Sequence, residues 1–147
     1  MEKLEELYRL AEARRIPVYC FPLPCCKALS VMDAEGDCQI GIDPMQLASE
    51  ADEAVKLAHE LGHCETGSFY NRYTPLDVRG KHEKQAWDWA VQRLLPWEQL
   101  EAAMAAGHTE PYDLAEHFGL PEDFIRRALD YYALGGEGRG ENGHQAV

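Results

Sequence analysis

Residues 49–67 carry the signals of one amphipathic helix that must pack closely against other parts of the chain. Ser49 is expected to cap its start, with Asp52 as the reciprocal acid, and Gly67 is expected to end it. Apolar residues recur at helical spacing along one face, which predicts burial of that face: Ala51, Ala54, Val55, Ala58, Leu61 and Gly62. Because Gly62 has no side chain, another element can approach the helix there.

Two histidines, His59 and His63, stand near the end of this helix in the order His-Glu-x-x-His. Residues four apart share a helix face, so both imidazoles can reach one metal ion. Glu60 is one step round the helix, where its carboxylate can reach a water molecule on that metal rather than the metal itself. This arrangement is typical of zinc hydrolases. We therefore predict His59 and His63 as ligands of one Zn²⁺ per chain and Glu60 as a catalytic residue.

A third ligand is expected because a catalytic zinc usually takes three protein ligands and leaves a fourth position for water. Residues 81–95 predict a second helix, and Glu83 lies on its apolar stripe, where a lone carboxylate would be costly to bury. Binding a dication removes that cost. The alternative is that Glu83 lies at an exposed first turn, where the helix dipole favours an acid. Given the histidine pair, we predict Glu83 as the third ligand.

Other ligand arrangements fit this sequence less well. A three-histidine site of the H-E-x-x-H-x-x-G-x-x-H kind is excluded, because Phe69 stands at the third histidine position and Thr66 at the glycine position. His82 and Asp88 fall off the apolar stripe of their helix and are expected at the surface. Cys64 is expected to face away from the metal and to pack as a small residue.

Hydrolysis at such a site needs a general base and an oxyanion donor. Zinc lowers the pKa of a bound water toward neutrality and polarises a substrate carbonyl. Glu60 would take the proton and return it to the leaving amine. In the loop that follows the motif, Tyr70, Tyr73 and Arg79 are candidates to stabilise the oxyanion, although each could instead be a packing or surface residue. We name Tyr70 as the candidate.

The remaining pattern predicts an α+β fold, mostly helical, with a small β-sheet near the N-terminus packed on the motif helix. Prolines 17, 22 and 24 favour extended or irregular chain. One domain is expected over residues 1–134, ending in a helix pair at 111–134, and a glycine-rich polar tail at 135–147 is expected to be disordered. The predicted elements are helices at 2–15, 49–66, 81–95, 97–106, 112–118 and 122–134, and strands at 27–32 and 38–42.

Composition limits the partners and the cellular setting. The net charge of −12 argues against direct nucleic-acid binding and suits a basic protein or peptide partner, although acidity also serves solubility. No apolar run approaches membrane-spanning length and the N-terminus is a charged helix, so we expect a cytoplasmic protein with no membrane partner. The five cysteines are expected to be free thiols. A zinc site at Cys25, Cys26 and Cys38 is disfavoured because adjacent cysteines lack the usual C-x-x-C spacing.

The motif and the second helix together resemble the ImmA/IrrE-type zinc metallopeptidases, small proteins of bacteria and phages often encoded beside helix-turn-helix repressors on mobile elements. The resemblance covers roughly residues 40–135 and lies in these segments: His59–His63, Gly67–Tyr70, Glu83–Ala86, Trp89–Ala90 and Leu94–Pro96. It implies a zincin-like fold, zinc bound by the two histidines and Glu83, and a catalytic Glu60. It also implies cleavage or inactivation of a repressor, which derepresses prophage or mobile-element genes.

Two features depart from the family pattern. Position 87 is Trp where the family more often has Asp or Asn, a change that can alter how neighbouring metal ligands are oriented. The chain is also expected to lack a separate repressor-type DNA-binding domain. Residues 113–125 do have a helix-turn-helix cadence, but Glu122 and Asp123 stand where a DNA reader would place Arg, Lys, Asn or Gln. We interpret this pair as a packing or partner-docking element.

Three hypotheses therefore follow from the sequence. The first is a zinc metallopeptidase that cleaves a specific protein, such as a helix-turn-helix repressor. The second is a metal-binding regulatory protein that inactivates its repressor by binding, without proteolysis. The third is a structural helix in which the His-Glu-x-x-His order is accidental. The variant Glu60→Gln separates the first two, because only proteolysis needs the carboxylate as a base.

Overall fold

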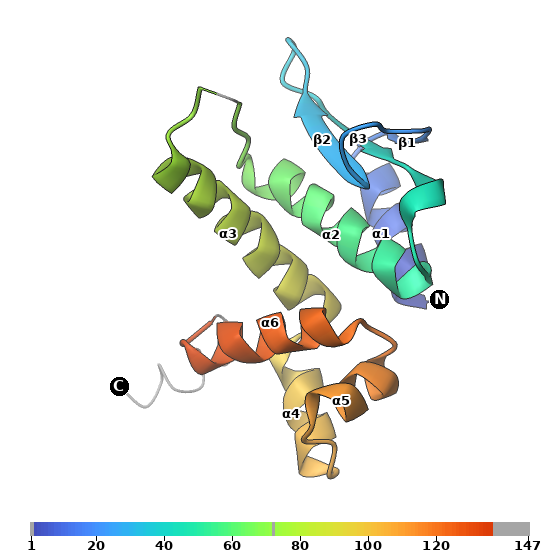
Figure 1. The fold of residues 1–147 in the computed structure, drawn as a ribbon, viewed down its shortest axis with the longest axis vertical. Coiled ribbons are helices and arrows are strands. Elements are labelled where there is room, and N and C mark those ends of the chain that lie inside the picture. Colours follow the sequence, from blue (N-terminus) through green and yellow to red (C-terminus); the bar gives the residue numbers. More distant parts are fainter. Residues whose placement is uncertain (1, 72, 137–147) are drawn as a thin grey trace. The chain divides into compact units, whose positions relative to one another are not determined.

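A computed structural model describes residues 2–71 and 73–136 of the chain (Figure 1). The chain divides into two compact units, residues 1–90 and residues 91–147, and each is described by itself. The expected disordered tail at 135–147 lies outside the described residues from position 137 onward. One domain over residues 1–134 stays a prediction.

The elements confirm an α+β fold that is mostly helical. The first unit contains α1 (Glu2–Ala13), β1 (Val18–Cys20), β2 (Ala28–Met32), β3 (Cys38–Ile42), η1 (Pro44–Gln46), α2 (Glu50–Thr66) and most of α3 (Leu76–Leu94). The second unit holds the end of α3, then α4 (Trp97–Ala105), α5 (Pro111–Phe118) and α6 (Glu122–Ala133). Among the described residues, no helix combines the length and apolar character needed to cross a bilayer.

Two element predictions need correction. The sequence pattern did not predict strand β1, because the strand is only three residues long and the prolines on either side of it favour irregular chain. The helix predicted at 81–95 corresponds to α3, which begins at Leu76, five residues before the predicted start. Its early turns run through Gly80, a poor helix former, which is why the sequence pattern placed the start too late.

The three strands form one sheet in the order β1-β3-β2, with β3 parallel to β1 and antiparallel to β2. As predicted, the sheet packs on the motif helix, since β2 and β3 both contact α2 (Figure 1). On β3, Ile40 and Ile42 are buried. Ser30 on β2 is directly opposite Ile40, and its side chain reaches Glu60 on α2. The edge strand β2 therefore brings a hydroxyl to the motif helix.

The predicted start and end of α2 are confirmed, and so is the close approach of another element at Gly62. The backbone amide of Asp52 donates to Ser49 Oγ over 3.1 Å, and Gly67 ends the helix in the left-handed conformation with φ 66°. The Asp52 carboxylate accepts from the amide of Ala48 (3.0 Å), not from that of Ser49. A Cβ added at Gly62 would overlap the carbonyl oxygen of Ala86, so only glycine allows α3 to lie this close.

The expectation of five free thiols is wrong for two cysteines. Cys38 on β3 and Cys64 on α2 form a disulfide, with their Cα atoms 5.8 Å apart. The packing of the sheet on α2 joins positions 26 residues apart in the sequence, which cysteine spacing alone does not reveal. The other three cysteines, Cys20, Cys25 and Cys26, are free.

The second unit is a small helical core. The helix-turn-helix cadence of residues 113–125 corresponds to α5 and α6, which contact each other and are separated by Gly119 in the left-handed conformation. Its buried side chains include Leu100, Leu114, Phe124 and Ile125. The predicted helix pair at the C-terminal end is therefore confirmed.

Candidate metal centre

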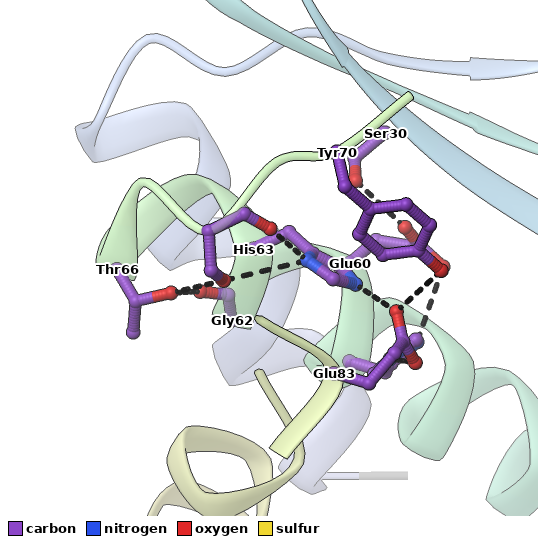
Figure 2. Close-up of polar contacts among 9 residues, drawn as sticks. Ser30, Glu60, Gly62, His63, Thr66, Tyr70 and Glu83 are labelled. Carbon is purple, nitrogen blue, oxygen red and sulfur yellow. Dashed lines mark hydrogen bonds and ion pairs between the residues drawn. The ribbon is translucent and has the colours of Figure 1, made fainter. Parts of the chain in front are cut away.

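The three predicted ligands converge on one point in the first unit. His59 and His63 lie one turn apart on α2, and Glu83 comes from α3. His59 Nε2 lies 3.0 Å from Glu83 Oε2, and His63 Nε2 lies 2.9 Å from Glu83 Oε1. Figure 2 shows the His63 and Glu83 side chains directed toward each other. Each imidazole thus presents the same ring nitrogen to the same carboxylate.

Glu60 lies beside this group and is buried. Its Oε1 accepts a hydrogen bond from Ser30 Oγ over 2.8 Å (Figure 2). Its Oε2 lies 3.2 Å from His59 Nδ1. Ligand atoms of His59, Glu60 and His63 all lie within 4.8 Å of one another, which makes them a possible metal-binding group. Two carboxylates, Glu60 and Glu83, are therefore within reach of a shared ion.

The orientation of the imidazoles distinguishes the two carboxylates. Both Nε2 atoms face Glu83, whereas Glu60 meets only the Nδ1 of its neighbour His59. A metal ion bound through the two Nε2 atoms would therefore lie next to Glu83. Glu60 would remain close by, with its carboxylate held by a hydroxyl and a ring nitrogen.

His63 is oriented by the turn that ends α2. Its Nδ1 lies 2.5 Å from the backbone oxygen of Ser68, and a carbonyl can only accept, so Nδ1 carries the proton. Thr66 Oγ1 donates to the carbonyl of Gly62 over 2.7 Å and contacts Ser68 Oγ, which fixes this turn (Figure 2). With the proton on Nδ1, the lone pair of Nε2 is available to a metal.

Both ring nitrogens of each histidine consequently face acceptors. His63 lies between the Ser68 carbonyl and Glu83, and His59 lies between Glu60 and Glu83. Such an arrangement is stable only if the imidazoles are protonated or if a cation lies among the Nε2 atoms and the carboxylate. The donor set of two imidazoles and one carboxylate fits Zn²⁺.

The electrostatics of the group favour positive charge. Burial lowers the pKa of His59, but hydrogen bonds to the carboxylates of Glu60 and Glu83 outweigh burial and raise this pKa to about 9. Hydrogen bonds from His59 and His63 hold the pKa of Glu83 well below its usual range. Glu83 is therefore ionised at neutral pH and can neutralise part of the charge of a dication.

A cavity of about 330 Å³ opens onto these residues. Apolar and polar side chains both line it; the lining residues are Ala28, Leu29, Ser30, His59, Glu60, His63, Phe69, Tyr70 and Glu83. Of the three oxyanion candidates, Tyr70 is the one that lines the cavity. Its hydroxyl donates to Glu83 Oε1 over 3.1 Å, and burial and the charge of Glu83 raise its pKa (Figure 2).

Phe69, which stands at the third histidine position of the excluded arrangement, lines the cavity, with its ring centroid 6.2 Å from that of His63. His82 differs from its predicted surface position. It is half-buried, its Nδ1 is buried without a hydrogen-bond partner among the described residues, and its ring stacks with Tyr70 at 6.4 Å. Asp88 pairs with Lys84 along the helix over 2.6 Å.

Sequence reasoning missed two residues that shape the site, and it singled out a third, Trp87, without predicting the contact that this residue makes. Ser30 holds Glu60, Ser68 holds His63, and the Trp87 indole stacks on the His59 ring with centroids 4.2 Å apart. A signal existed for Ser30, which is the polar residue in an otherwise apolar strand, and for Trp87, which lies four positions after Glu83. Ser68 contributes a backbone carbonyl, which no side-chain pattern reveals.

Comparison with known families decides the relationship. The model of the IrrE N-terminal-like domain, Peptidase_M78, matches residues 40–130. The chain belongs to this family. The match confirms the resemblance that we inferred from the motif and the second helix, and it identifies a metallopeptidase-like domain that includes α2 and α3. No curated protein and no solved structure gave a significant match.

Proposed function

We propose that this member of the IrrE N-terminal-like family is a zinc-dependent metallopeptidase that binds one zinc ion through His59, His63 and Glu83. One observation carries the proposal: the Nε2 atoms of both histidines face the same carboxylate at 3.0 and 2.9 Å, while both Nδ1 atoms face other acceptors. A shared cation satisfies all of these groups at once. Two imidazoles and one glutamate are also the ligand set of several zinc peptidases.

When bound, zinc would supply a Lewis acid that lowers the pKa of water and polarises a peptide carbonyl. The residues of the chain complete the chemistry. Glu60, held by Ser30 and beside His59, is the general base, and its carboxylate carries the proton to the leaving amine nitrogen. Tyr70 is the proposed oxyanion donor, because its hydroxyl lies at the cavity next to Glu83.

For the substrate we propose a protein or peptide, with a helix-turn-helix repressor of a prophage or mobile element as the specific target and the cytoplasm as the place of action. The resemblance to ImmA/IrrE-type proteins and the net charge of −12, which suits a basic partner segment, support this choice. Nucleic acid is not a proposed direct partner, because Glu122 and Asp123 occupy the first turn of α6.

The test combines metal content with cleavage. The purified chain should carry about one zinc per molecule, and incubation with the repressor encoded beside it should yield fragments that a chelator prevents. Glu60→Gln should keep the zinc and lose cleavage by at least about a hundredfold, because the base is removed while the ligands remain. Tyr73→Phe is a matched control, because the Tyr73 side chain is 78% exposed and does not line the cavity.

Three outcomes would contradict the proposal. Normal cleavage by Glu60→Gln would remove this carboxylate from the chemistry. Full derepression in cells by Glu60→Gln, without fragments of the repressor, would favour inactivation by binding. A wild-type protein that binds no zinc would reject the metal site itself.

A further inference from the structure

The indole of Trp87 stacks on His59, one of the proposed metal ligands. It lies four residues after Glu83, so both side chains leave the same face of α3. Its indole and the imidazole of His59 are stacked, with ring centroids 4.2 Å apart and planes inclined by 20°. One face of α3 thus supplies a carboxylate to both histidines and an aromatic surface to one of them.

The two histidines are held by different kinds of contact. His63 donates its Nδ1 proton to the Ser68 carbonyl, so a backbone hydrogen bond fixes its ring. His59 has no such carbonyl partner among its described contacts; its Nδ1 lies 3.2 Å from the carboxylate of Glu60. Its Nε2 faces Glu83, so both polar contacts of the His59 ring are to carboxylate side chains, and one of these must itself act as a base. The stacked indole restricts rotation of that ring.

We propose that Trp87 is a positioning residue for metal binding, which keeps the ring plane of His59 aligned so that Nε2 remains directed at Glu83. The indole N–H is a donor and the ring offers no acceptor in its plane, so Trp87 does not compete with Glu60 for the Nδ1 proton. Stacking therefore orients His59 and leaves Glu60 in its hydrogen-bonded position. The inference rests on the proposed function for the identity of the bound ion, but the stack itself is a contact between two residues of the chain.

Because the stack orients the His59 ring before the metal binds, it should increase metal affinity. Removal of groups that orient metal ligands typically weakens metal affinity about 10–100-fold. Trp87→Leu keeps an apolar side chain but removes the flat surface, so zinc affinity should fall by about tenfold. Trp87→Phe keeps an aromatic face and should stay within about threefold of the wild type. Trp89→Leu is the matched control, since it lies two positions further along α3 and thus on a different face.

The experiment measures zinc affinity by competition with a chromogenic chelator and records the ring-proton NMR shifts of His59 in the zinc-free proteins. In the wild type, the indole should shift the His59 ring protons upfield. This shift should disappear in Trp87→Leu and persist in Trp89→Leu. Unchanged zinc affinity and unchanged His59 shifts in Trp87→Leu would overturn the positioning role.

Tryptophan fluorescence keeps the test decisive if Trp87→Leu fails to fold. Zinc should change the emission of the wild type, because one of its indoles contacts a ligand, and this change should be absent from Trp87→Phe. A zinc-induced change that persists in Trp87→Phe would overturn the inference. A wild type that binds no zinc would reject the proposed function, whereas zinc binding with no response at Trp87 would reject only the role of this residue.

Discussion

The two compact units of the chain bury different kinds of side chain. In the first unit Asp43, Glu60, His63 and Ser68 are all buried, and these are the buried polar or charged residues of the described chain. The second unit buries apolar side chains and Tyr132, whose hydroxyl donates to the carbonyl of Leu95 over 2.8 Å. Burial of ionisable groups is unfavourable unless they are paired. Of the four, Glu60 and His63 line the cavity, whereas Asp43 accepts hydrogen bonds from Leu23, Met45 and Gln46 in a turn. The first unit therefore buries ionisable groups at the candidate metal centre, while the second unit has an apolar core.

The largest effect on stability is expected in the second unit. Phe124→Ala removes a side chain that is 2% exposed and should lower the free energy of unfolding by about 3–5 kcal/mol. Zinc affinity should not change, because all proposed ligands lie in the first unit. Urea unfolding and a zinc titration measure the two quantities. Leu134→Ala, at a side chain that is 88% exposed, is the control. If Phe124→Ala also weakened zinc binding, the metal site in the first unit would not be independent of the core of the second unit.

A somewhat smaller loss is expected where α2 and α3 meet. Gly62→Ala places a methyl group against the backbone of Ala86, and the helices must separate to accept it. We expect a loss of about 1–3 kcal/mol in the free energy of unfolding, with weaker zinc binding because Glu83 moves away from the histidines. Gly80→Ala is the matched control: nothing lies within 4 Å of its added methyl, so it should stabilise α3 by about 0.5–1 kcal/mol.

Metal removal should affect the first unit specifically. At a free zinc concentration about 100 times Kd, binding stabilises the folded state by about 2.7 kcal/mol, so a chelator should lower the thermal midpoint of the wild type. His63→Ala should unfold at the same temperature with and without the chelator. Calorimetry checks this. If His63→Ala responds to the chelator as the wild type does, the metal lies elsewhere.

The smallest effect is a pH dependence of the zinc-free protein. The pKa of His59 rises from about 6.5 in the unfolded chain to about 9 in the folded protein. Its contribution to stability is therefore fully present below about pH 6.5 and is lost as the pH rises through about 9. We expect a loss of about 1 kcal/mol, reduced by solvent screening because the Glu83 side chain is 33% exposed. Chemical unfolding at pH 6.5 and 9.5 measures it, and His59→Gln should show no such loss across this window.

The motif helix was predictable from the sequence alone. Ser49, Gly62 and Gly67 are local signals for a cap, a close approach and a stop, and the structure contains all three. The spacing of His59 and His63 requires only helix geometry, so their common face was predictable. The approach of Glu83 to the histidines was also predictable, because burial of a carboxylate on an apolar stripe is costly unless a positive group lies nearby.

The surroundings of these residues depend on tertiary packing. The contacts of Ser30 with Glu60 and of Cys38 with Cys64 depend on how the sheet lies against α2, over separations of 30 and 26 residues. The stack of Trp87 on His59 depends on the approach of α3 at Gly62. Local sequence patterns encode which residues share a helix face, because the helix repeat is fixed. They do not encode the distances between elements, because these distances come from packing that the whole unit sets together.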